Sequence, residues 1–293
     1  MRRYDETRHP RTGLTGYQYS SIFDKFDPEK KRSADRAWVQ FKDQFPDHHP
    51  HEGRLTGAGR MRLIIGQSVL CRLHVARTLG SAGAAFARSA VADAEAYAAW
   101  SYDFGSNVFH PLFTDGFRLT GHVIARDGYF GKAGQAFETR PADGLVFWSF
   151  LAAWRVSRST LLWAVARNIG FHLGLGDIGL QPGAPRLDPR EVPDPTPACF
   201  GLLELDAEFP GAGYLGAAAG LAERMCKDLE RDHFPPSSPA VPALNIDRVE
   251  PLAILHVAAR LAGRSAAMLP FFSHAGLDTF NGWIREDSAP ALA

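Results

Sequence analysis

Apolar residues recur at helical spacing in six stretches of this 293-residue chain. In the first stretch, apolar side chains return every three or four positions from Met61 to Ala76, and Gly80 ends the pattern. This period places the apolar side chains on one face of a helix, which a folded protein buries. The six predicted helices cover residues 60–79, 84–102, 144–156, 159–173, 213–232 and 249–262.

Short turns join the first four of these helices in pairs. Only residues 80–83 separate the first helix from the second. The fourth helix follows the third after a very short turn, and Ser159 or Thr160 is expected to be its N-cap. Turns this short predict antiparallel helical hairpins.

The segments between the predicted helices are irregular. Residues 103–141 have no helical period and are expected to hold short strands, whereas residues 174–197 are rich in proline and glycine and are expected to form a loop. Residues 198–206 give no clear pattern. Because strands and helices do not alternate, we predict a mostly α fold, an α/α-toroid or helical-hairpin barrel with a few short β-strands, formed by residues 1–293 as a single domain.

The composition is ordinary, with 45% hydrophobic and 22% charged residues and a formal net charge of zero. Nothing in it attracts nucleic acid or a membrane, so any site for a polyanion must be local. The charged residues 1–6 lead to no apolar segment, so no signal peptide is expected. As written the chain is expected in the cytoplasm, or in the periplasm if its true start lies upstream.

Three cysteines are odd in number and far apart in the sequence. Their positions fit neither a zinc spacing nor a disulfide framework. We therefore predict that all three are buried and act as small apolar residues. They are Cys71, Cys199 and Cys226.

The densest candidate chemistry lies near the start of the chain. Arg8 and His9 are adjacent, and after a turn at residues 10–16 come Tyr17, Gln18 and Tyr19. Arginine binds carboxylates and a neutral histidine binds divalent metals, so this group suits an acidic sugar chain. The alternative is an ordinary helix end at which cations complement the helix dipole.

A second candidate is the glycine-rich segment 126–132. Arg126 and Lys132 could pair with uronate carboxylates, and Tyr129 could stack on a sugar ring. The alternative is a turn with an internal pair between Arg126 and Asp127.

Two further groups have a structural interpretation that we prefer. Residues 48–52 hold three histidines and a glutamate that could chelate zinc or nickel, but Pro50 keeps the segment extended, which favours a solvated loop. Trp148, Trp154 and Trp163 lie on predicted helices, where tryptophan more often packs in a core than binds sugar.

Three blocks of the chain, taken together and in this order, resemble the family 2 polysaccharide lyases, the periplasmic-type pectate lyases. The resemblance extends from residue 1 to about residue 285. The blocks are Arg8-His9-Pro10 to Tyr17-Gln18-Tyr19-Ser20, Leu112 with Thr114-Asp115-Gly116 and Arg126-Asp127-Gly128-Tyr129-Phe130-Gly131-Lys132, and Ala164 with Ala166-Arg167-Asn168-Ile169-Gly170 and Leu173-Gly174-Leu175-Gly176-Asp177-Ile178-Gly179.

The resemblance implies an α/α barrel and a metal-assisted β-elimination on polygalacturonate that gives 4,5-unsaturated oligogalacturonides. Arg8 would correspond to the catalytic base, and His9 to a ligand of a divalent metal of the Mn or Ca class. Tyr17, Arg126, Tyr129 and Lys132 are the expected substrate-binding residues. From its chemistry alone Arg8 would be a carboxylate clamp, since a guanidinium hardly deprotonates.

The chain departs from the family pattern at its start. The family metal site also uses a histidine and a glutamate upstream of the Arg-His pair, yet residues 1–7 contain Glu6 and no histidine. The chain is therefore expected to match the C-terminal half of the family's domain, an incomplete toroid. Its uncovered apolar faces predict self-association or a partner chain that supplies the missing part.

Two other functions stay open on sequence grounds. One is a catalytically inactive remnant or uronate-binding protein of the same fold. The other is a different α/α-barrel carbohydrate enzyme, an unsaturated uronyl hydrolase or epimerase. That enzyme would need an acid or base in its groove, for which Asp115, Asp127 and His110 are the candidates.

Overall fold

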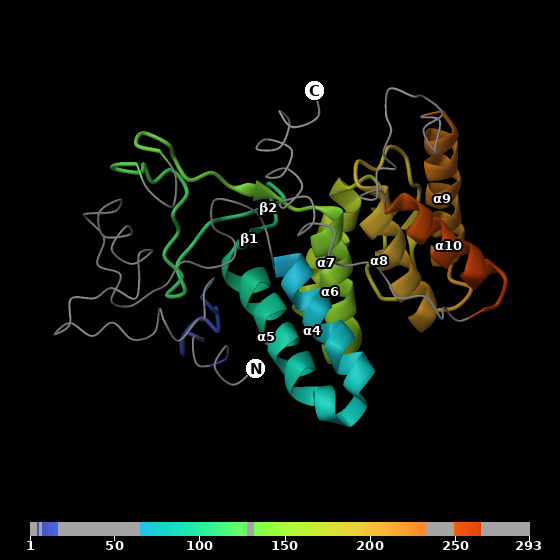
Figure 1. The fold of residues 1–293 in the computed structure, drawn as a ribbon, viewed down its shortest axis with the longest axis horizontal. Helices are drawn as coiled ribbons and strands as arrows, with labels where there is room; N and C mark the ends of the chain where they lie inside the picture. Colours follow the sequence, from blue (N-terminus) through green and yellow to red (C-terminus); the bar gives the residue numbers. More distant parts are fainter. Residues whose placement is uncertain (1–4, 6–7, 17–64, 128–131, 232–248, 265–293) are drawn as a thin grey trace, which may run out of the picture. The chain divides into compact units, whose positions relative to one another are not determined.

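The computed structural model of the chain describes residues 5, 8–16, 65–127, 132–231 and 249–264. They belong to two compact units, of which the first comprises Met1–Ile65 with Val75–Ala142 and the second Gly66–His74 with Asp143–Ala293. Figure 1 shows the helices and strands. The expectation of a single domain stays a prediction. No helix among the described residues is long and apolar enough to cross a membrane.

The first unit is organised around one long helix. The last residues of α4 (Ile65–Leu79) lead into the short 3-10 helix η1 (Gly80–Gly83), which turns the chain into α5 (Ala84–Trp100). Three two-residue strands follow and form an antiparallel sheet in the order β1-β2-β3. They are β1 (Tyr102–Asp103), β2 (Val108–Phe109) and β3 (Arg140–Pro141).

The chain between β2 and β3 folds back on itself over a small core of its own. Isolated bridges pair Leu112 with Arg118 and Val123 with Ala136. Beneath them lies a cluster of buried side chains, Phe113, Leu119, Ile124 and Phe137. The short strands expected between residues 103 and 141 are thus present, and the apolar cluster fixes the loops that join them.

The second unit is a set of packed helices. Helix α6 packs against α7 and α8, α8 packs against α9, and α10 packs against both α8 and α9. Strands β4 (Gly176–Asp177) and β5 (Arg186–Leu187) form a small antiparallel pair between α7 and α8 in the sequence. The helices are α6 (Gly144–Ser157), α7 (Thr160–His172), α8 (Pro195–Glu208), α9 (Tyr214–Arg231) and α10 (Glu250–Leu261).

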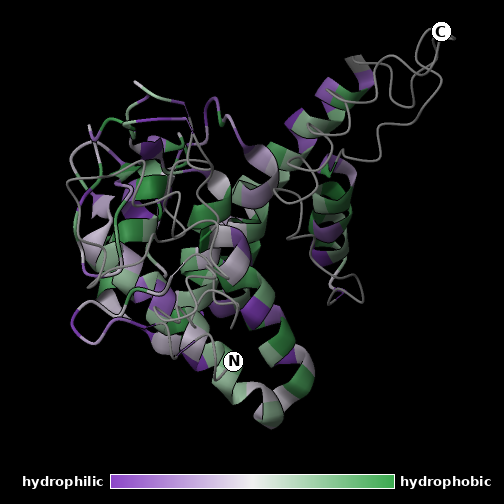
Figure 2. Ribbon diagram, turned by 60° about the vertical axis from the view of Figure 1, so that its left-hand side comes forward, coloured by the Kyte–Doolittle hydropathy of each residue, from purple (hydrophilic) through white to green (hydrophobic). Residues whose placement is uncertain are grey.

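Aromatic side chains fill the space between these helices. Trp148 stacks on Phe200 with ring centroids 4.7 Å apart, and Trp154 lies 4.8 Å from Trp163. All three tryptophans are buried, which confirms the core interpretation. In Figure 2 the long helices carry both hydrophobic and hydrophilic positions, as helices with one buried face do.

The mostly α fold class is confirmed, and closure of the hairpins into a ring stays a prediction. Two expectations were wrong. Residues 195–197, expected in a loop, begin α8, because proline is tolerated in the first turn of a helix. Cys71 is exposed, since it lies on an outward position of α4, whereas Cys199 is buried as predicted and Cys226 is half-buried.

Several sequence predictions fall outside the described residues. These are the N-terminal end of the first predicted helix at 60–64, the histidine cluster at 48–52, and the two tyrosines Tyr17 and Tyr129.

Candidate functional site

The candidate site begins with a tight turn formed by residues 8–16, which we call the N-terminal turn. The His9 amide donates to the Leu14 carbonyl and the Gly13 amide donates to the His9 carbonyl, each over 2.9 Å. Gly13 has a φ of +73°, a conformation that glycine adopts without strain. Leu14 is fully buried and anchors the turn to the first unit.

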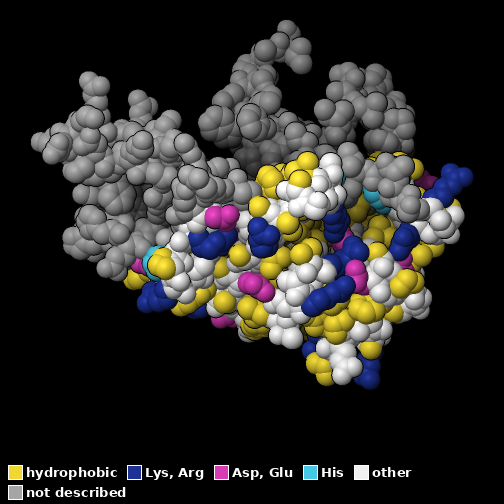
Figure 3. All heavy atoms as spheres, turned by 90° about the horizontal axis from the view of Figure 1, so that it is seen from below, with side chains coloured by type: hydrophobic (Ala, Val, Ile, Leu, Met, Phe, Trp, Pro, Cys, Tyr) yellow, Lys and Arg dark blue, Asp and Glu magenta, His cyan; other side chains and the backbone are white. Residues whose placement is uncertain are grey.

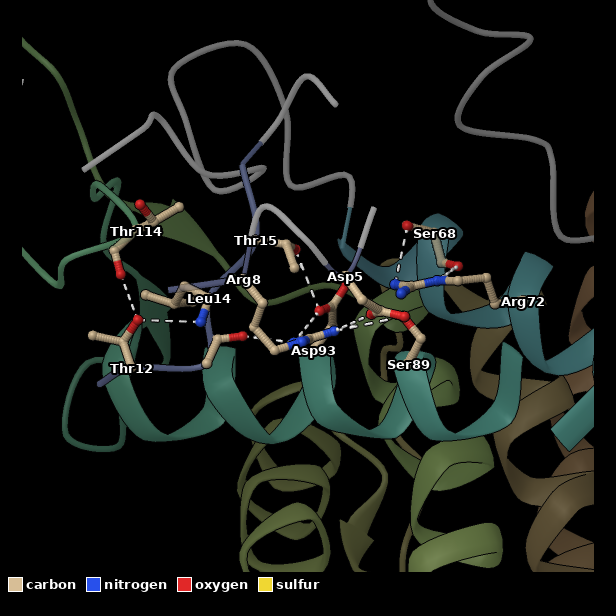
Figure 4. Close-up of polar contacts among 11 residues, drawn as sticks. Asp5, Arg8, Thr12, Leu14, Thr15, Ser68, Arg72, Ser89, Asp93 and Thr114 are labelled. Carbon is tan, nitrogen blue, oxygen red and sulfur yellow. Dashed lines mark hydrogen bonds and ion pairs between the residues drawn. The ribbon is translucent and has the colours of Figure 1, made fainter. Parts of the chain in front are cut away.

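Arg8 ties this turn to α5 through both edges of its guanidinium. Nη1 donates to Oδ1 of Asp93 over 2.7 Å and to the Gly13 carbonyl over 2.6 Å. Nη2 donates to Oδ1 of Asp5 over 3.0 Å and to Oγ of Ser89 over 3.5 Å. Figure 4 shows these groups converging above α5. The arrangement is a two-sided clamp on two carboxylates.

The electrostatics of this clamp keep Arg8 charged. Burial of the guanidinium works to lower its pKa, but the charge of Asp93 and the hydrogen bonds to Asp5 and Asp93 outweigh burial and raise it. The Asp93 side chain is fully buried, so its attraction for Arg8 is little screened by water. To act as a base, the Arg8 guanidinium would first have to lose a proton, which its pairing with Asp93 opposes.

His9, the predicted metal ligand, is half-buried beside Arg8. Its Nδ1 accepts a hydrogen bond from the Arg11 amide over 3.3 Å. A neutral ring that accepts at Nδ1 carries its proton on Nε2, so binding a metal at Nε2 would require the other tautomer and the loss of this bond. Within the described residues, no group of three or more His, Cys, Asp or Glu side chains is placed to hold a metal ion.

The N-terminal turn is joined to the Thr114-Asp115-Gly116 segment. Arg11 Nη2 donates to the Asp115 carbonyl over 2.5 Å, and its guanidinium lies 5.9 Å from the centroid of the Trp100 ring. Thr12 Oγ1 donates to the Thr114 carbonyl. Segments about a hundred residues apart in the sequence, which carry two of the three resemblance blocks, are therefore in direct contact.

Arg126, Asp127 and Lys132 are the described residues of the second predicted group, and hydrogen bonds join the backbone on either side of them. The Ile124 amide donates to the Gln135 carbonyl and the Gly134 amide donates to the Ile124 carbonyl, each over 2.9 Å. Lys132 Nζ lies 3.1 Å from Oδ2 of Asp127, and both side chains are mostly exposed. The alternative interpretation of this segment paired Asp127 with Arg126, and the structure pairs Asp127 with Lys132.

A backbone amide also holds the Asp127 side chain. Its Oδ1 accepts from the Ala133 amide over 2.9 Å. That bond, followed by the hydrogen bond from Lys132, lowers the pKa of the Asp127 carboxyl. Lys132 and Arg126 are both exposed. On the face drawn in Figure 3 cations and anions are interspersed among hydrophobic side chains.

The three acid or base candidates each make a local bond in the first unit. His110 Nδ1 lies 2.8 Å from Thr120 Oγ1, and burial, followed by the charge of Arg118, lowers the pKa of the ring. Asp115 Oδ1 accepts from the Phe117 amide over 2.9 Å.

The third block belongs to the second unit. Arg167 donates from Nε and Nη2 to the two carboxylate oxygens of Asp177, each over 2.7 Å. Asp177 Oδ1 also accepts from the Gly179 amide over 2.8 Å. These bonds hold together the turn that follows α7.

Sequence reasoning missed Asp93, Ser89 and Asp5 as parts of the candidate site. A signal for Asp93 was present, since it lies three positions after Ala90 and four before Tyr97, both on the apolar stripe of the second predicted helix. A carboxylate at a buried helical position needs a cation or several hydrogen-bond donors. The sequence did not say which cation.

Two comparisons with known proteins both show similarity to pectate lyases. The family model described as periplasmic pectate lyase matches residues 1–280. A pectate disaccharide-lyase from Dickeya dadantii (strain 3937) is 29% identical over 162 residues, which is 53% of this chain and 29% of that protein. The matched region therefore covers less than a third of the length of this relative.

Proposed function

Because this chain belongs to the periplasmic pectate lyase family, we propose that it acts on polygalacturonate as a lyase, by a β-elimination that gives 4,5-unsaturated oligogalacturonides. The observation that carries the proposal is the family match over residues 1–280. The partial similarity to a pectate disaccharide-lyase supports the same substrate class.

The proposed reaction develops negative charge on the substrate, which cationic side chains of the protein can stabilise. In this reaction a base takes the C5 proton of a galacturonate unit, the electrons of that bond form the C4–C5 double bond, and the glycosidic oxygen leaves C4 with its bonding electrons. C5 carries a carboxylate, so removal of the proton builds negative charge on that group. A preformed positive charge at this position stabilises the transition state. Arg8 is the proposed catalytic residue, and Tyr17, Arg126, Tyr129 and Lys132 are the proposed substrate-binding residues.

The contacts of Arg8 favour an electrostatic role over that of a base. Its guanidinium is held by Asp93 and Asp5, and its pKa is raised. A charged guanidinium can neutralise the substrate carboxylate without losing a proton. The base implied by the family resemblance would require the Arg8 guanidinium to lose a proton, which Asp93 and Asp5 oppose.

His9 is proposed to supply one ligand to a divalent metal of the Mn or Ca class. Catalytic metal sites normally use about three protein ligands. The described residues do not provide such a set around His9, so they do not fit a complete metal site and none of the steps above passes through a metal. Calorimetric titration of the chain and of His9→Ala with Mn²⁺ and Ca²⁺ tests this part of the proposal.

The test of the function is the ultraviolet absorbance of the unsaturated product. Polygalacturonate is incubated with the chain, with and without Mn²⁺ or Ca²⁺. We expect absorbance to rise, and the rate to fall by about 10²–10³ in Arg8→Ala, the effect of removing one donor that stabilises developing charge. Arg190→Ala, which removes an exposed arginine of the second unit, is the matched control. If no metal condition gives product, the lyase proposal is wrong.

A non-catalytic uronate-binding protein of the same family is the second candidate. It is favoured by the engagement of Arg8 with the chain's own carboxylates and by the incomplete ligand set around His9 within the described residues. Calorimetric binding of oligogalacturonate without formation of unsaturated product would select it.

A further inference from the structure

The two carboxylates that hold Arg8 differ in their surroundings. The Asp93 side chain is fully buried, whereas the Asp5 side chain is 40% exposed. Nη1 of Arg8, which faces Asp93, also donates to the Gly13 carbonyl, so this edge is fixed within the fold. Nη2 donates to the partly exposed Asp5. One edge of the guanidinium is therefore held by a fully buried carboxylate and the other by a partly exposed one.

A second donor points at the same oxygen of Asp5. Ser89 Oγ on α5 donates to Oδ1 of Asp5 over 2.8 Å, and Arg8 Nη2 donates to that oxygen over 3.0 Å. Ser89 itself is buried, with 4% of its surface exposed. A cation and a hydroxyl converging on one carboxylate oxygen form a carboxylate-binding site, which in this structure is filled by the chain's own Asp5 (Figure 4).

We propose that Arg8 Nη2 and Ser89 Oγ form a uronate-carboxylate subsite, and that Asp5 occupies it until a substrate carboxylate displaces it. The proposal rests on the proposed function for the class of ligand. It assigns Asp5 as the residue that sets affinity at this subsite, Ser89 as a second donor and Asp93 as the positioning residue that holds Arg8 in place.

The exchange is balanced in charge and in hydrogen bonds. One carboxylate leaves the Arg8 and Ser89 donors and another takes its place, so neither donor is left unsatisfied. Because Asp5 is partly exposed, its carboxylate can be hydrated when it leaves. Asp93 has no such alternative, because a buried carboxylate without its cation would be strongly destabilising.

The experiment measures binding of trigalacturonate by calorimetry, with and without Ca²⁺, to the full chain and to Asp5→Asn. Removing the competing carboxylate should tighten binding by about two- to five-fold, the size of a partly exposed ion pair. Asp5→Glu keeps the charge and should bind like the unmodified chain. Trigalacturonate methyl ester, which lacks the carboxylate charges, should bind Asp5→Asn and the unmodified chain equally.

Two further variants keep the result interpretable. Asp103→Asn changes another acidic residue of the first unit, one that bonds to Ser106 and not to Arg8, and should leave affinity unchanged. Ser89→Ala removes the second donor and should weaken binding of trigalacturonate by about two- to ten-fold, both alone and when combined with Asp5→Asn. Hydrogen exchange across residues 8–16 checks that the turn is intact.

The outcomes separate this proposal from the lyase proposal. Equal or weaker binding by a folded Asp5→Asn, or an equal gain in affinity for the methyl ester, would overturn the subsite, even if the chain produces unsaturated product. Tighter binding by Asp5→Asn without any product would support the subsite and overturn the lyase. Absence of trigalacturonate binding by every variant would overturn the subsite as well.

Discussion

Two arginines in this chain, one in each unit, each join two structural elements through an ion pair with a buried carboxylate. Arg8 joins the N-terminal turn to the buried Asp93 on α5, and Arg155 on α6 joins the mostly buried Glu204 on α8. Helices α6 and α8 also share a stacked aromatic pair and a broad apolar contact, whereas the turn contributes one fully buried apolar side chain, Leu14. The position of the turn therefore depends mainly on polar contacts, the ion pair with Asp93 among them, whereas the helix pair also has its broad apolar contact.

The largest expected effect comes from removing each arginine in turn. Arg8→Met leaves Asp93 buried without its cation and should lower the free energy of unfolding of the first unit by about 3–5 kcal/mol. Arg155→Met also removes the cation of Glu204, but it should cost less, about 2–3 kcal/mol, because the Glu204 side chain is not fully buried, Glu208 keeps Arg158 and the apolar contact remains. Urea unfolding monitored by hydrogen exchange in each unit measures both.

A double variant tests the reason for that difference. In Arg8→Met with Asp93→Leu, the buried charge is gone together with its partner, so most of the lost stability should return. If the double variant is as unstable as Arg8→Met alone, the cost comes from lost packing of the arginine stem and the comparison above is wrong.

The next effect in size concerns two glycines, one in each region. A Cβ at Gly201 on α8 would lie 2.5 Å from a ring carbon of Phe147, so Gly201→Ala should cost about 1–3 kcal/mol by overpacking. A Cβ at Gly13 would meet only Ala96 at 3.6 Å, but the φ of +73° makes Gly13→Ala cost about 1–2 kcal/mol through the backbone.

Gly13→Asn distinguishes the two causes, because asparagine tolerates a positive φ better than alanine does. It should be milder than Gly13→Ala when melting temperatures are compared, whereas Gly201→Asn should be worse than Gly201→Ala. The opposite order at either position would contradict the assigned cause.

The helical hairpins could be predicted from the sequence because most of their helices have one apolar face and clear ends. Helix α8 could not. It is covered by α6, α9 and α10, so it is buried on nearly every side and has no amphipathic period to detect. Its two prolines, Pro195 and Pro197, suggested a loop, although both lie in the first turn, where proline is tolerated.

The candidate site was predictable only in part. The adjacent Arg8 and His9 were visible in the sequence, but two of the partners of Arg8 come from α5, more than 80 residues away. Which carboxylate a given arginine reaches is decided by tertiary packing, and no local pattern encodes it. The likeness of the blocks to a known family gave the family, whereas the contacts of Asp5 and Asp93 required coordinates.

A smaller effect contrasts two helix starts in the second unit. Asp143 caps α6, since its Oδ1 accepts from the Val146 amide over 2.8 Å. Ser159 is at the N-cap position of α7 but makes no side-chain capping bond. Asp143→Ala should therefore cost about 1 kcal/mol and Ser159→Ala only a few tenths, measured by thermal unfolding. Equal losses would contradict this assignment of the caps.

The smallest expected effect is a difference in response to acid. The hydrogen bond from Arg167 lowers the pKa of Asp177. Burial works to raise the pKa of Glu208, but hydrogen bonds from Arg158 and Arg155 outweigh burial and lower it. A carboxyl whose folded pKa lies below its unfolded value stabilises the fold above the unfolded pKa, and this contribution is lost as the pH falls through the folded value.

The second unit should therefore lose stability as the pH falls below the ordinary values of 4.5 for Glu208 and 3.8 for Asp177. Because the pairs are partly exposed, each should contribute less than about 1 kcal/mol. The pKa of Arg8 in the first unit is raised, so Arg8 stays charged throughout this pH range. Asp177→Asn should flatten the acid limb of unfolding free energy against pH in the second unit. An unchanged acid limb in that variant would show that its stability in acid depends on other carboxylates.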